Sequence, residues 1–285
     1  MVIFGRKKKI KIEEPEDREV TISLGYSGNY EVDVNGDAHV IIGKVHGIGS
    51  REMQQDSFGV SELHTEDDLR RSILAVVADG MGGMSQGEQA SMLSVVSSLS
   101  FFDENKIGEN IHDYMLDMAE NANAKVIEGL GENSNSGSTL ICALFIENEM
   151  HFCSVGDSHI LLYHDGSITQ LNTDHIYANR LKKQVEMGLI TQEEADRADQ
   201  KGALTSFIGQ DYLEEVDVND QPVLLESGDR IIICSDGVYN SVSNESLCEA
   251  MQYPVDRSGT YIDMQITNLR KRNQDNYTAL IIELL

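Results

Sequence analysis

Short apolar runs alternate with turn residues along most of the chain, and this pattern restricts the folds that the chain can adopt. The runs lie at residues 40–45, 57–60, 73–78, 138–146, 150–155, 159–164, 167–171, 230–235 and 277–284. They are rich in the Val, Ile, Leu and Phe residues of buried strands. Two of the turns between them, Glu147-Asn148 and Asp165-Gly166, are very short. Since such short connections join antiparallel strands, the pattern predicts antiparallel sheets rather than a doubly wound parallel fold.

Two long helical patterns interrupt these runs. The first covers 86–101, with apolar residues at positions 90, 93, 96 and 99. The second covers 107–130, and one of its faces carries Ile111, Met115, Met118, Ala122, Val126 and Leu130. Later helices are predicted near 176–187, 192–200, 245–251 and 258–272. The predicted fold class is therefore α+β, with helices packed over antiparallel sheets.

The first 38 residues differ from the rest of the chain in the clustering of their charged side chains. A basic cluster at 6–11 is followed by the acidic segment EEPEDRE at 13–19, which indicates a polar extension. Residues 30–42 alternate apolar and polar side chains around Asn35-Gly36, a dipeptide typical of type I′ turns, and so predict a hairpin. The rest of the sequence shows no internal repeat and no second domain boundary. We therefore expect an N-terminal extension over 1–38 and one domain over 39–285.

Charge and composition exclude several classes of partner. The chain has 48 acidic against 22 basic residues and a net charge of −26 at pH 7. Phosphates of nucleic acids and anionic membranes would repel such a surface, so neither is an expected partner. No apolar run approaches the roughly 20 residues of a transmembrane helix. The cysteines form no C-x-x-C pair and are expected to be reduced core thiols: Cys142, Cys153, Cys234 and Cys248. We expect a cytoplasmic protein and a monomer.

Five aspartates lie at the ends of the apolar runs. Asp79, Asp157 and Asp236 follow such runs, whereas Asp56 and Asp275 precede them. A single aspartate at a strand end is most often a turn former or a helix cap. Five carboxylates that converged would repel one another strongly unless cations neutralised them. The set therefore indicates a site for hard divalent cations, Mg²⁺ or Mn²⁺, of which two about 3.5–4 Å apart can activate a water molecule.

Seven short motifs, in order along the chain, resemble those of a known family. They are REMQQD (51–56), DGMGG (79–83), SGSTL (136–140), VGDS (155–158), TDH (173–175), CSDG (234–237) and RNQDN (272–276). Each motif is common by itself, but the ordered set resembles the metal-dependent protein serine/threonine phosphatases of type 2C, the PPM family, and its bacterial members in particular. The resemblance runs from about residue 40 to the C-terminus. It implies an α/β/β/α four-layer sandwich, with two central, mainly antiparallel sheets flanked by helices.

The resemblance also implies a set of metal ligands. Asp79 would bridge two metal ions, and the Gly80 carbonyl would be a further ligand. Asp236 and Asp275 would bind one of the ions. Asp56 would act mainly through metal-bound waters. The family often places an aspartate linked to a third metal ion before the GST triplet, whereas this chain has SNS at 134–136, so we expect two ions.

Further residues are implied to handle the substrate or to support the site. Arg51 would bind the substrate phosphate, because a guanidinium matches phosphate oxygens and keeps its charge at any working pH. Gln55, Asp157 and Asn276 would provide supporting hydrogen bonds. Residues 176–205 match the variable flap over the active site, which is concerned with substrate choice.

The implied activity is hydrolysis of phosphoserine and phosphothreonine in proteins by a metal-activated water molecule, without a covalent phosphoenzyme. The sequence agrees, since no cysteine has an arginine six positions later and no D-x-D-x-T/V motif is present. Met81 stands where some family members carry a histidine, so we expect water to protonate the leaving group. The expected partners are phosphorylated proteins, the substrates of a cognate kinase. The alternative is a catalytically weak relative that binds phosphoproteins as a regulatory module, and the retention of all the metal-site aspartates favours the enzyme.

Overall fold

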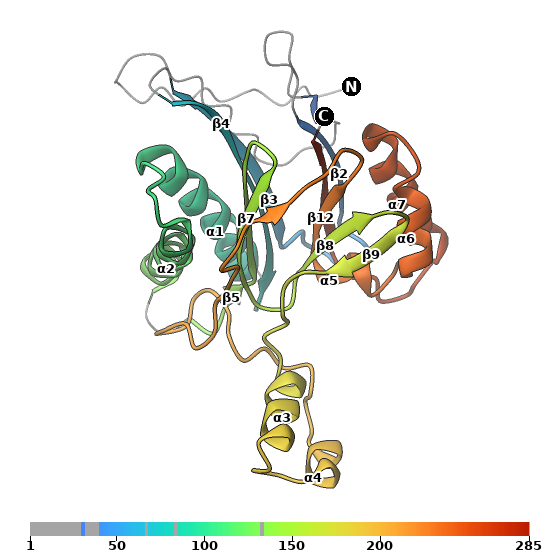
Figure 1. The fold of residues 1–285 in the computed structure, drawn as a ribbon. Coiled ribbons are helices and arrows are strands. Elements are labelled where there is room, and N and C mark those ends of the chain that lie inside the picture. Colours follow the sequence, from blue (N-terminus) through green and yellow to red (C-terminus); the bar gives the residue numbers. More distant parts are fainter. Residues whose placement is uncertain (1–29, 32–39, 66–67, 83–84, 132–133, 285) are drawn as a thin grey trace.

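Two antiparallel β-sheets pack face to face, and helices cover their outer faces (Figure 1). The structure, a computed structural model, describes residues 30–31, 40–65, 68–82, 85–131 and 134–284. Every strand pairing within these ranges is antiparallel. The four-layer α/β/β/α sandwich and the α+β class predicted from the sequence are therefore confirmed.

The first sheet joins the two ends of the described chain. Its strand order is β1-β2-β13-β12-β8-β9. The bounds are β1 Tyr30–Glu31, β2 Val40–Gly47, β13 Tyr277–Leu284, β12 Arg230–Cys234, β8 His159–His164 and β9 Ser167–Gln170. The last strand, β13, lies between β2 and β12, so residues far apart in the sequence become neighbours in this sheet.

The second sheet is built mostly from the middle of the chain. Its order is β10-β7-β6-β4-β3, with β11 paired to β7 and β5 paired to β4. The bounds are β10 Asp217–Val218, β7 Glu149–Val155, β6 Leu140–Ile146, β4 Asp68–Met81, β3 Asp56–Thr65, β11 Val223–Leu224 and β5 Gly137–Ser138. In β4, Leu74 and Val76 face the helices while Ala75 and Val77 face the other sheet. Because both faces are covered, this strand reads as an unbroken apolar run.

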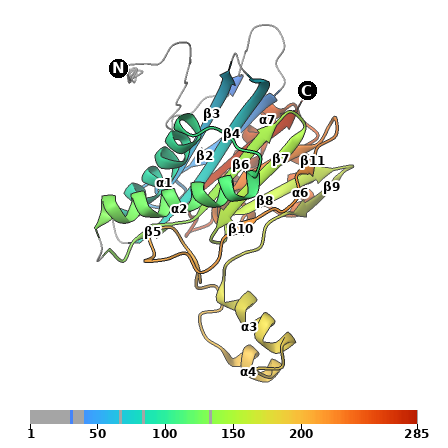
Figure 2. The same cartoon turned by 60° about the vertical axis from the view of Figure 1, so that its left-hand side comes forward.

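Helices form the outer layers and one projection. α1 (Ser85–Glu104) and α2 (Ile111–Leu130) cover the second sheet, and α5 (Asp236–Tyr239), α6 (Asn244–Ala250) and α7 (Val255–Asn268) cover the first. α3 (Tyr177–Glu186) and α4 (Gln192–Arg197) project from the end of the sandwich at which β5 lies (Figures 1 and 2). These two helices occupy the segment predicted as a flap, and its role in substrate choice stays a prediction.

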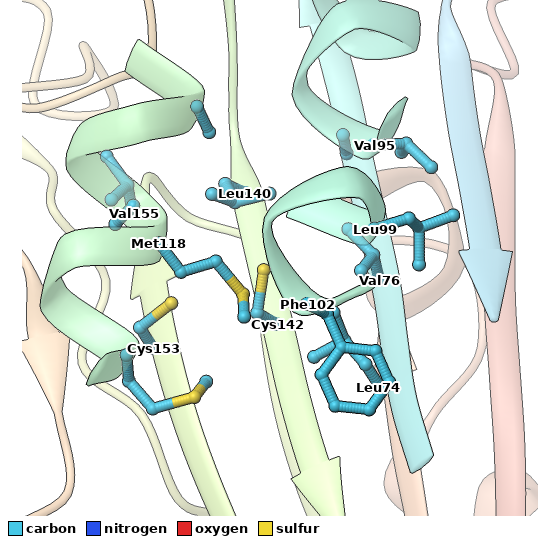
Figure 3. Packing of buried hydrophobic residues seen from close by; sticks show 14 of the residues in the cluster. Leu74, Val76, Val95, Leu99, Phe102, Met118, Leu140, Cys142, Cys153 and Val155 are labelled. Atoms are coloured by element: carbon cyan, nitrogen blue, oxygen red, sulfur yellow. The ribbon is translucent and has the colours of Figure 1, made fainter. Parts of the chain in front are cut away.

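The core beneath α1 and α2 explains the helical patterns in the sequence. Figure 3 shows buried side chains of α1 and α2 packed on buried side chains of β4, β6 and β7. The helices contribute Val95, Leu99, Phe102 and Met118, and the strands contribute Leu74, Val76, Leu140, Cys142, Cys153 and Val155. Cys142 and Cys153 are cross-strand partners, and both are free thiols. All four cysteines are free and three of them are buried, which is consistent with the predicted core thiols.

Several element boundaries differ from those predicted. α2 begins at Ile111 rather than 107, because the Asn110 side chain accepts a hydrogen bond from the Asp113 backbone and caps the helix there. α7 begins at Val255, directly after Pro254, which is three residues before the predicted start at 258. It ends at Asn268. The short elements α5, β10 and β11 were not predicted, since two to four residues are too few to show a hydrophobic period.

The N-terminal predictions are tested only in part. Tyr30 and Glu31 pair antiparallel with Ile42 and Ile41, as the arms of a hairpin would. The turn at Asn35-Gly36 and most of the extension over 1–38 lie outside the described residues, so the domain boundary stays a prediction. Among the described helices, none combines the length and the apolar character that a membrane span requires.

Candidate active site

Strand ends bring the five predicted aspartates to one end of the sandwich. Asp56 begins β3 and Asp79 lies near the end of β4, and the two residues are cross-strand partners. Asp236 follows β12, while Asp275 precedes β13, the antiparallel neighbour of β12. Asp157 follows β7. In an antiparallel pair, the end of one strand and the start of the next share a rim, so the carboxylates converge there.

Two hydroxyl groups hold the carboxylate of Asp56. This residue is buried, and its Oδ2 accepts hydrogen bonds from Ser235 Oγ and from Thr278 Oγ1, both at 2.7 Å. Its Oδ1 is buried as well but has no hydrogen-bond partner, and the same is true of Oδ1 of Asp236. Because an unpaired buried carboxylate oxygen is costly, these two atoms point to a bound cation or its water.

Burial and mutual repulsion raise the pKa of the converging carboxyls. Burial, with a further contribution from Asp236, raises the pKa of Asp56 to about 6. Burial and the charges of Asp56 and Asp236 raise the pKa of Asp79 well above its usual value. The pKa of Asp157 rises to about 6 through burial and the charge of Asp236. The pKa of Asp236 is raised by burial and by Asp275. Such a cluster is stable in ionised form only with compensating positive charge.

An arginine supplies part of the compensating positive charge. Arg51 Nη2 lies 2.5 Å from Asp275 Oδ2, with 56 % and 38 % of the two side chains exposed. The positive charge of Arg51 also lowers the pKa of Asp236, against the effect of burial. The residue predicted to bind phosphate therefore pairs with a residue predicted to bind metal.

The donor set fits divalent metal ions in its chemistry. It consists of carboxylate oxygens, two of them buried and unpaired, and such hard oxygens suit Mg²⁺ and Mn²⁺. Within the described ranges, however, no three or more His, Cys, Asp and Glu side chains are already arranged to hold an ion. The Asp275 carboxylate is directed to Arg51 through Oδ2, and its Oδ1 accepts a hydrogen bond from the Asn276 backbone N–H at 2.9 Å.

Asn276 fastens the loop that carries Arg51. Its Oδ1 accepts a hydrogen bond from the Gln55 backbone N–H at 2.9 Å. Its Nδ2 donates to the carbonyls of Ile48 and Met53 at 2.9 and 3.0 Å. The Asn276 side chain is therefore a clamp on the backbone between 48 and 55, and its supporting role in the reaction stays a prediction.

Gln55 contributes through its backbone as well. Its carbonyl accepts hydrogen bonds from the Gly80 N–H at 3.0 Å and from Ser91 Oγ at 2.5 Å. A Cβ at position 80 would lie 2.1 Å from the Gly87 carbonyl oxygen and 2.6 Å from that of Gln55. Only glycine allows this close approach of β3, β4 and α1, which places the Gly80 backbone beside the carboxylates.

Asp157 is tied to the base of the flap. Its backbone carbonyl accepts a hydrogen bond from Tyr239 Oη at 3.2 Å. The Tyr239 ring stacks on the His159 ring, with centroids 3.6 Å apart. His159 Nε2 in turn lies 3.2 Å from Oδ1 of Asp174, shortly before the flap begins. These contacts connect helix α5 to Asp174, two residues before the predicted flap, through the stacked rings of Tyr239 and His159.

Three hydroxyl residues that the sequence analysis did not single out complete the site. Ser235 and Thr278 hold Asp56, and Thr139 Oγ1 accepts a hydrogen bond from the Asp79 backbone N–H at 2.9 Å. Ser235 and Thr139 lie inside the quoted motifs CSDG and SGSTL, so the motifs marked their places without indicating their partners. Thr278 lies beyond the last motif, and no local pattern distinguishes it from other strand threonines.

Comparison with known proteins connects this geometry to a family. The sequence matches the family described as protein phosphatase 2C over residues 42–271. A protein of Streptococcus pyogenes described as protein phosphatase 2C-type is 30% identical over 241 residues, 82% of this chain and 94% of that protein. The serine/threonine protein phosphatase PstP of Mycobacterium tuberculosis is 29% identical over 232 residues, 80% of this chain and 43% of PstP.

Solved structures agree with these matches. The S. agalactiae serine/threonine phosphatase superposes with a TM-score of 0.72 at 28% identity, over 87% of this chain and 100% of that one. The catalytic domain of PstP, in complex with two manganese ions, superposes with a TM-score of 0.63 at 28% identity, over 87% and 99% of the two chains. The family match covers most of the chain, and the resemblance inferred from its motifs is confirmed. This chain belongs to the protein phosphatase 2C family, among bacterial relatives named as serine/threonine phosphatases.

Proposed function

We propose that this protein hydrolyses phosphoserine and phosphothreonine in proteins, with two divalent metal ions, Mg²⁺ or Mn²⁺, as cofactors. The observation that carries the proposal is the convergence of buried and half-buried carboxylates with raised pKa beside the exposed guanidinium of Arg51. Family membership and the two manganese ions in the PstP structure support it.

Each predicted ligand has a place in this proposal. Asp79 would contact both ions, with the Gly80 carbonyl beside one ion and Asp236 and Asp275 beside the other. The unpaired Oδ1 of Asp56 would accept hydrogen bonds from water around the ions. When bound, the ions supply an activated water molecule for in-line attack on phosphorus and neutralise the repelling carboxylates.

Arg51 orients the substrate. When Asp275 turns away, the guanidinium is free to donate two parallel hydrogen bonds to the phosphate oxygens. Its half-exposed position allows a phosphorylated side chain to reach it from solvent. Arg51 thereby fixes the phosphorus near the carboxylates and stabilises negative charge that develops on the phosphoryl oxygens.

The leaving Ser or Thr alkoxide takes its proton from water. Met81, the residue after Asp79-Gly80, carries no proton that it could donate. The expected substrates are phosphoproteins made by a serine/threonine kinase, and the projecting segment of α3 and α4 lies at the end of the sandwich where they would bind. A cytoplasmic location and a monomeric state stay predictions from the sequence.

A three-part assay tests the proposal. Hydrolysis of a phosphothreonine peptide and of an aryl phosphate is measured with Mn²⁺, with Mn²⁺ plus excess chelator, and for Asp79→Asn with Mn²⁺. We expect turnover only in the first case. Turnover that survives both the chelator and the substitution would contradict the two-metal mechanism. An intact protein that binds phosphopeptide but shows no metal-dependent turnover would instead establish the regulatory binding module.

A further inference from the structure

A histidine lies beneath the active site, between the two sheets. His46 is on β2, on the same face as Ile42 of the inter-sheet core. Its ring packs edge-on against Phe58 of β3, with centroids 5.1 Å apart and the planes at 64°. Lys44, buried on the same face, places its ammonium 5.0 Å from the centre of the same Phe58 ring. The roles proposed above for the site residues do not involve His46.

Hydrogen bonds connect His46 to the carboxylate of Asp56. His46 Nδ1 lies 2.9 Å from Thr278 Oγ1, and Thr278 Oγ1 donates to Asp56 Oδ2 at 2.7 Å. Thr278 is fully buried, and Ser235 donates to the same carboxylate oxygen. The path His46–Thr278–Asp56 therefore leads from the inter-sheet core to the catalytic rim.

The direction of this path follows from the number of protons available. A threonine hydroxyl has one hydrogen, and an ionised carboxylate can only accept. The Thr278 hydrogen is therefore used on Asp56, and the contact between His46 and Thr278 needs a hydrogen on His46 Nδ1. Nδ1 is then the donor and Nε2 carries the lone pair, which defines one tautomer of the neutral ring.

The surroundings keep the ring neutral. Burial, with a further contribution from the Lys44 ammonium, lowers the pKa of His46 to about 4. A neutral ring in a defined tautomer is a fixed hydrogen-bond donor rather than a charge. It can orient a hydroxyl without adding to the electrostatics of the carboxylate cluster.

We propose that His46 is a positioning residue for the reaction, which acts by donating its Nδ1 hydrogen to Thr278 so that the Thr278 hydroxyl holds Asp56. The inference rests on the proposed function. Without the donor, the Thr278 hydroxyl oxygen loses the hydrogen bond that fixes it from the core side, and its own hydrogen bond to Asp56 is less firmly oriented. The unpaired Oδ1 of Asp56, which would orient water at the metal ions, then loses its defined direction. Partners of this kind typically change metal affinity or activity by about 10–100-fold.

Two substitutions at position 46 separate the donor from the packing. His46→Phe keeps a ring against Phe58 but removes the donor, whereas His46→Asn keeps an amide N–H close to the position of Nδ1. For His46→Phe we expect Mn²⁺ affinity, measured by calorimetry, and kcat to fall about tenfold, with KM for a phosphopeptide little changed. For His46→Asn we expect both to stay within about threefold of the wild type. Equal losses in the two variants, or no loss in His46→Phe, would overturn the proposal.

Nitrogen-15 NMR of the ring gives a test that needs neither turnover nor correct folding of His46→Phe. In the metal-free wild type at neutral pH, we expect Nδ1 to be protonated and Nε2 to be unprotonated. In Thr278→Val, which removes the acceptor and keeps the side-chain shape, we expect the preference for Nδ1–H to be lost. An Nε2–H tautomer in the wild type would overturn the proposal. If the protein proved not to be a phosphatase, the tautomer and the Mn²⁺ affinity would still decide the role of His46.

Discussion

Arg51 and Asp275 form an ion pair, with 2.5 Å between Nη2 and Oδ2, from a loop before β3 and a turn before β13. The two residues are 224 positions apart in the sequence and are implied to serve different ligands, phosphate and metal. Both side chains are partly exposed, and such pairs contribute only about 0–1 kcal/mol. Replacing the pair by the two implied ligands would therefore cost little free energy.

The ion pair predicts opposite effects of two substitutions on metal affinity. Arg51→Ala removes a competing positive charge, so we expect Mn²⁺ to bind as tightly as in the wild type or more tightly. The same variant should lose about 10–100-fold in kcat/KM, since a charge-assisted hydrogen bond contributes about 1.5–3 kcal/mol. Asp275→Asn should weaken Mn²⁺ binding. Calorimetric titration with Mn²⁺ checks both, and weaker Mn²⁺ binding by Arg51→Ala would contradict the competition.

Asp79→Asn should abolish metal-dependent turnover and yet stabilise the metal-free protein. Burial and the neighbouring carboxylates raise the pKa of Asp79, so its ionised form is unfavourable in the folded state. An isosteric amide removes this repulsion, and we expect the free energy of unfolding at pH 7.5 to rise by about 1–3 kcal/mol. Urea unfolding with chelator present measures it.

The matched control is Asp165→Asn, which makes the same charge change in the exposed turn between β8 and β9. Its side chain is 93 % exposed and its φ of 48° is one that asparagine adopts readily. We expect a change below about 0.5 kcal/mol and normal turnover. If Asp79→Asn destabilised the metal-free protein, carboxylate repulsion would not be the dominant energy at this site.

The features that could be predicted from sequence are those with a local period or a local composition. The run at 73–78 lies in β4, and the run at 138–146 lies in β6 from Leu140 onward, because strands covered on both faces are apolar throughout. The site aspartates could be found because they stand at the ends of such runs. The four-residue helix α5 has no detectable period, and β4 extends into polar residues on both sides of its apolar core.

Contacts between distant polar residues could not be predicted in this way. Thr278 holds Asp56 across 222 positions, and serine and threonine are too common in strands for their pairing to be read locally. The Arg51–Asp275 pair was not predicted because the family resemblance had already implied another ligand for each residue, phosphate for Arg51 and metal for Asp275. The supporting role of Gln55 stays a prediction, and its backbone N–H and carbonyl take part in the hydrogen bonds given above.

The stability of the metal-free protein should fall as pH rises through about 6. Burial raises the folded-state pKa of Asp56 from a usual 3.8 to about 6. Between pH 3.8 and pH 6 the folded state retains a proton that the unfolded state has lost. The contribution of this carboxyl to the free energy of unfolding is therefore fully present below pH 3.8 and is lost as the pH rises through 6. For this buried carboxyl the loss is about 3 kcal/mol. The raised pKa of Asp157, also to about 6, acts in the same direction.

Chemical denaturation at pH 5 and pH 7.5, with chelator or with Mn²⁺, measures the part of this loss that falls between the two pH values, about 1 kcal/mol for Asp56. Divalent ions should restore stability mainly at pH 7.5, where the carboxylates are ionised and bind the metal. Asp56→Asn should reduce the pH dependence of the metal-free protein. A wild type that gains stability between the two pH values, with the same slope in Asp56→Asn, would show that these carboxyls do not control it.

Asn276→Ala should release the loop that presents Arg51. The substitution leaves the backbone groups of Gln55, Ile48 and Met53 without the partners that they have at 2.9–3.0 Å. Since Asn276 is buried, we expect a loss of about 3 kcal/mol in the free energy of unfolding. KM for a phosphopeptide should rise more than kcat falls, because Arg51 is the residue proposed to bind the phosphate and the carboxylates stay on their strands. Asn105→Ala is the control, since that exposed side chain, just after α1, donates only to the Phe101 carbonyl of α1. A fall in kcat at constant KM would indicate that Asn276 acts on the carboxylates rather than on the loop.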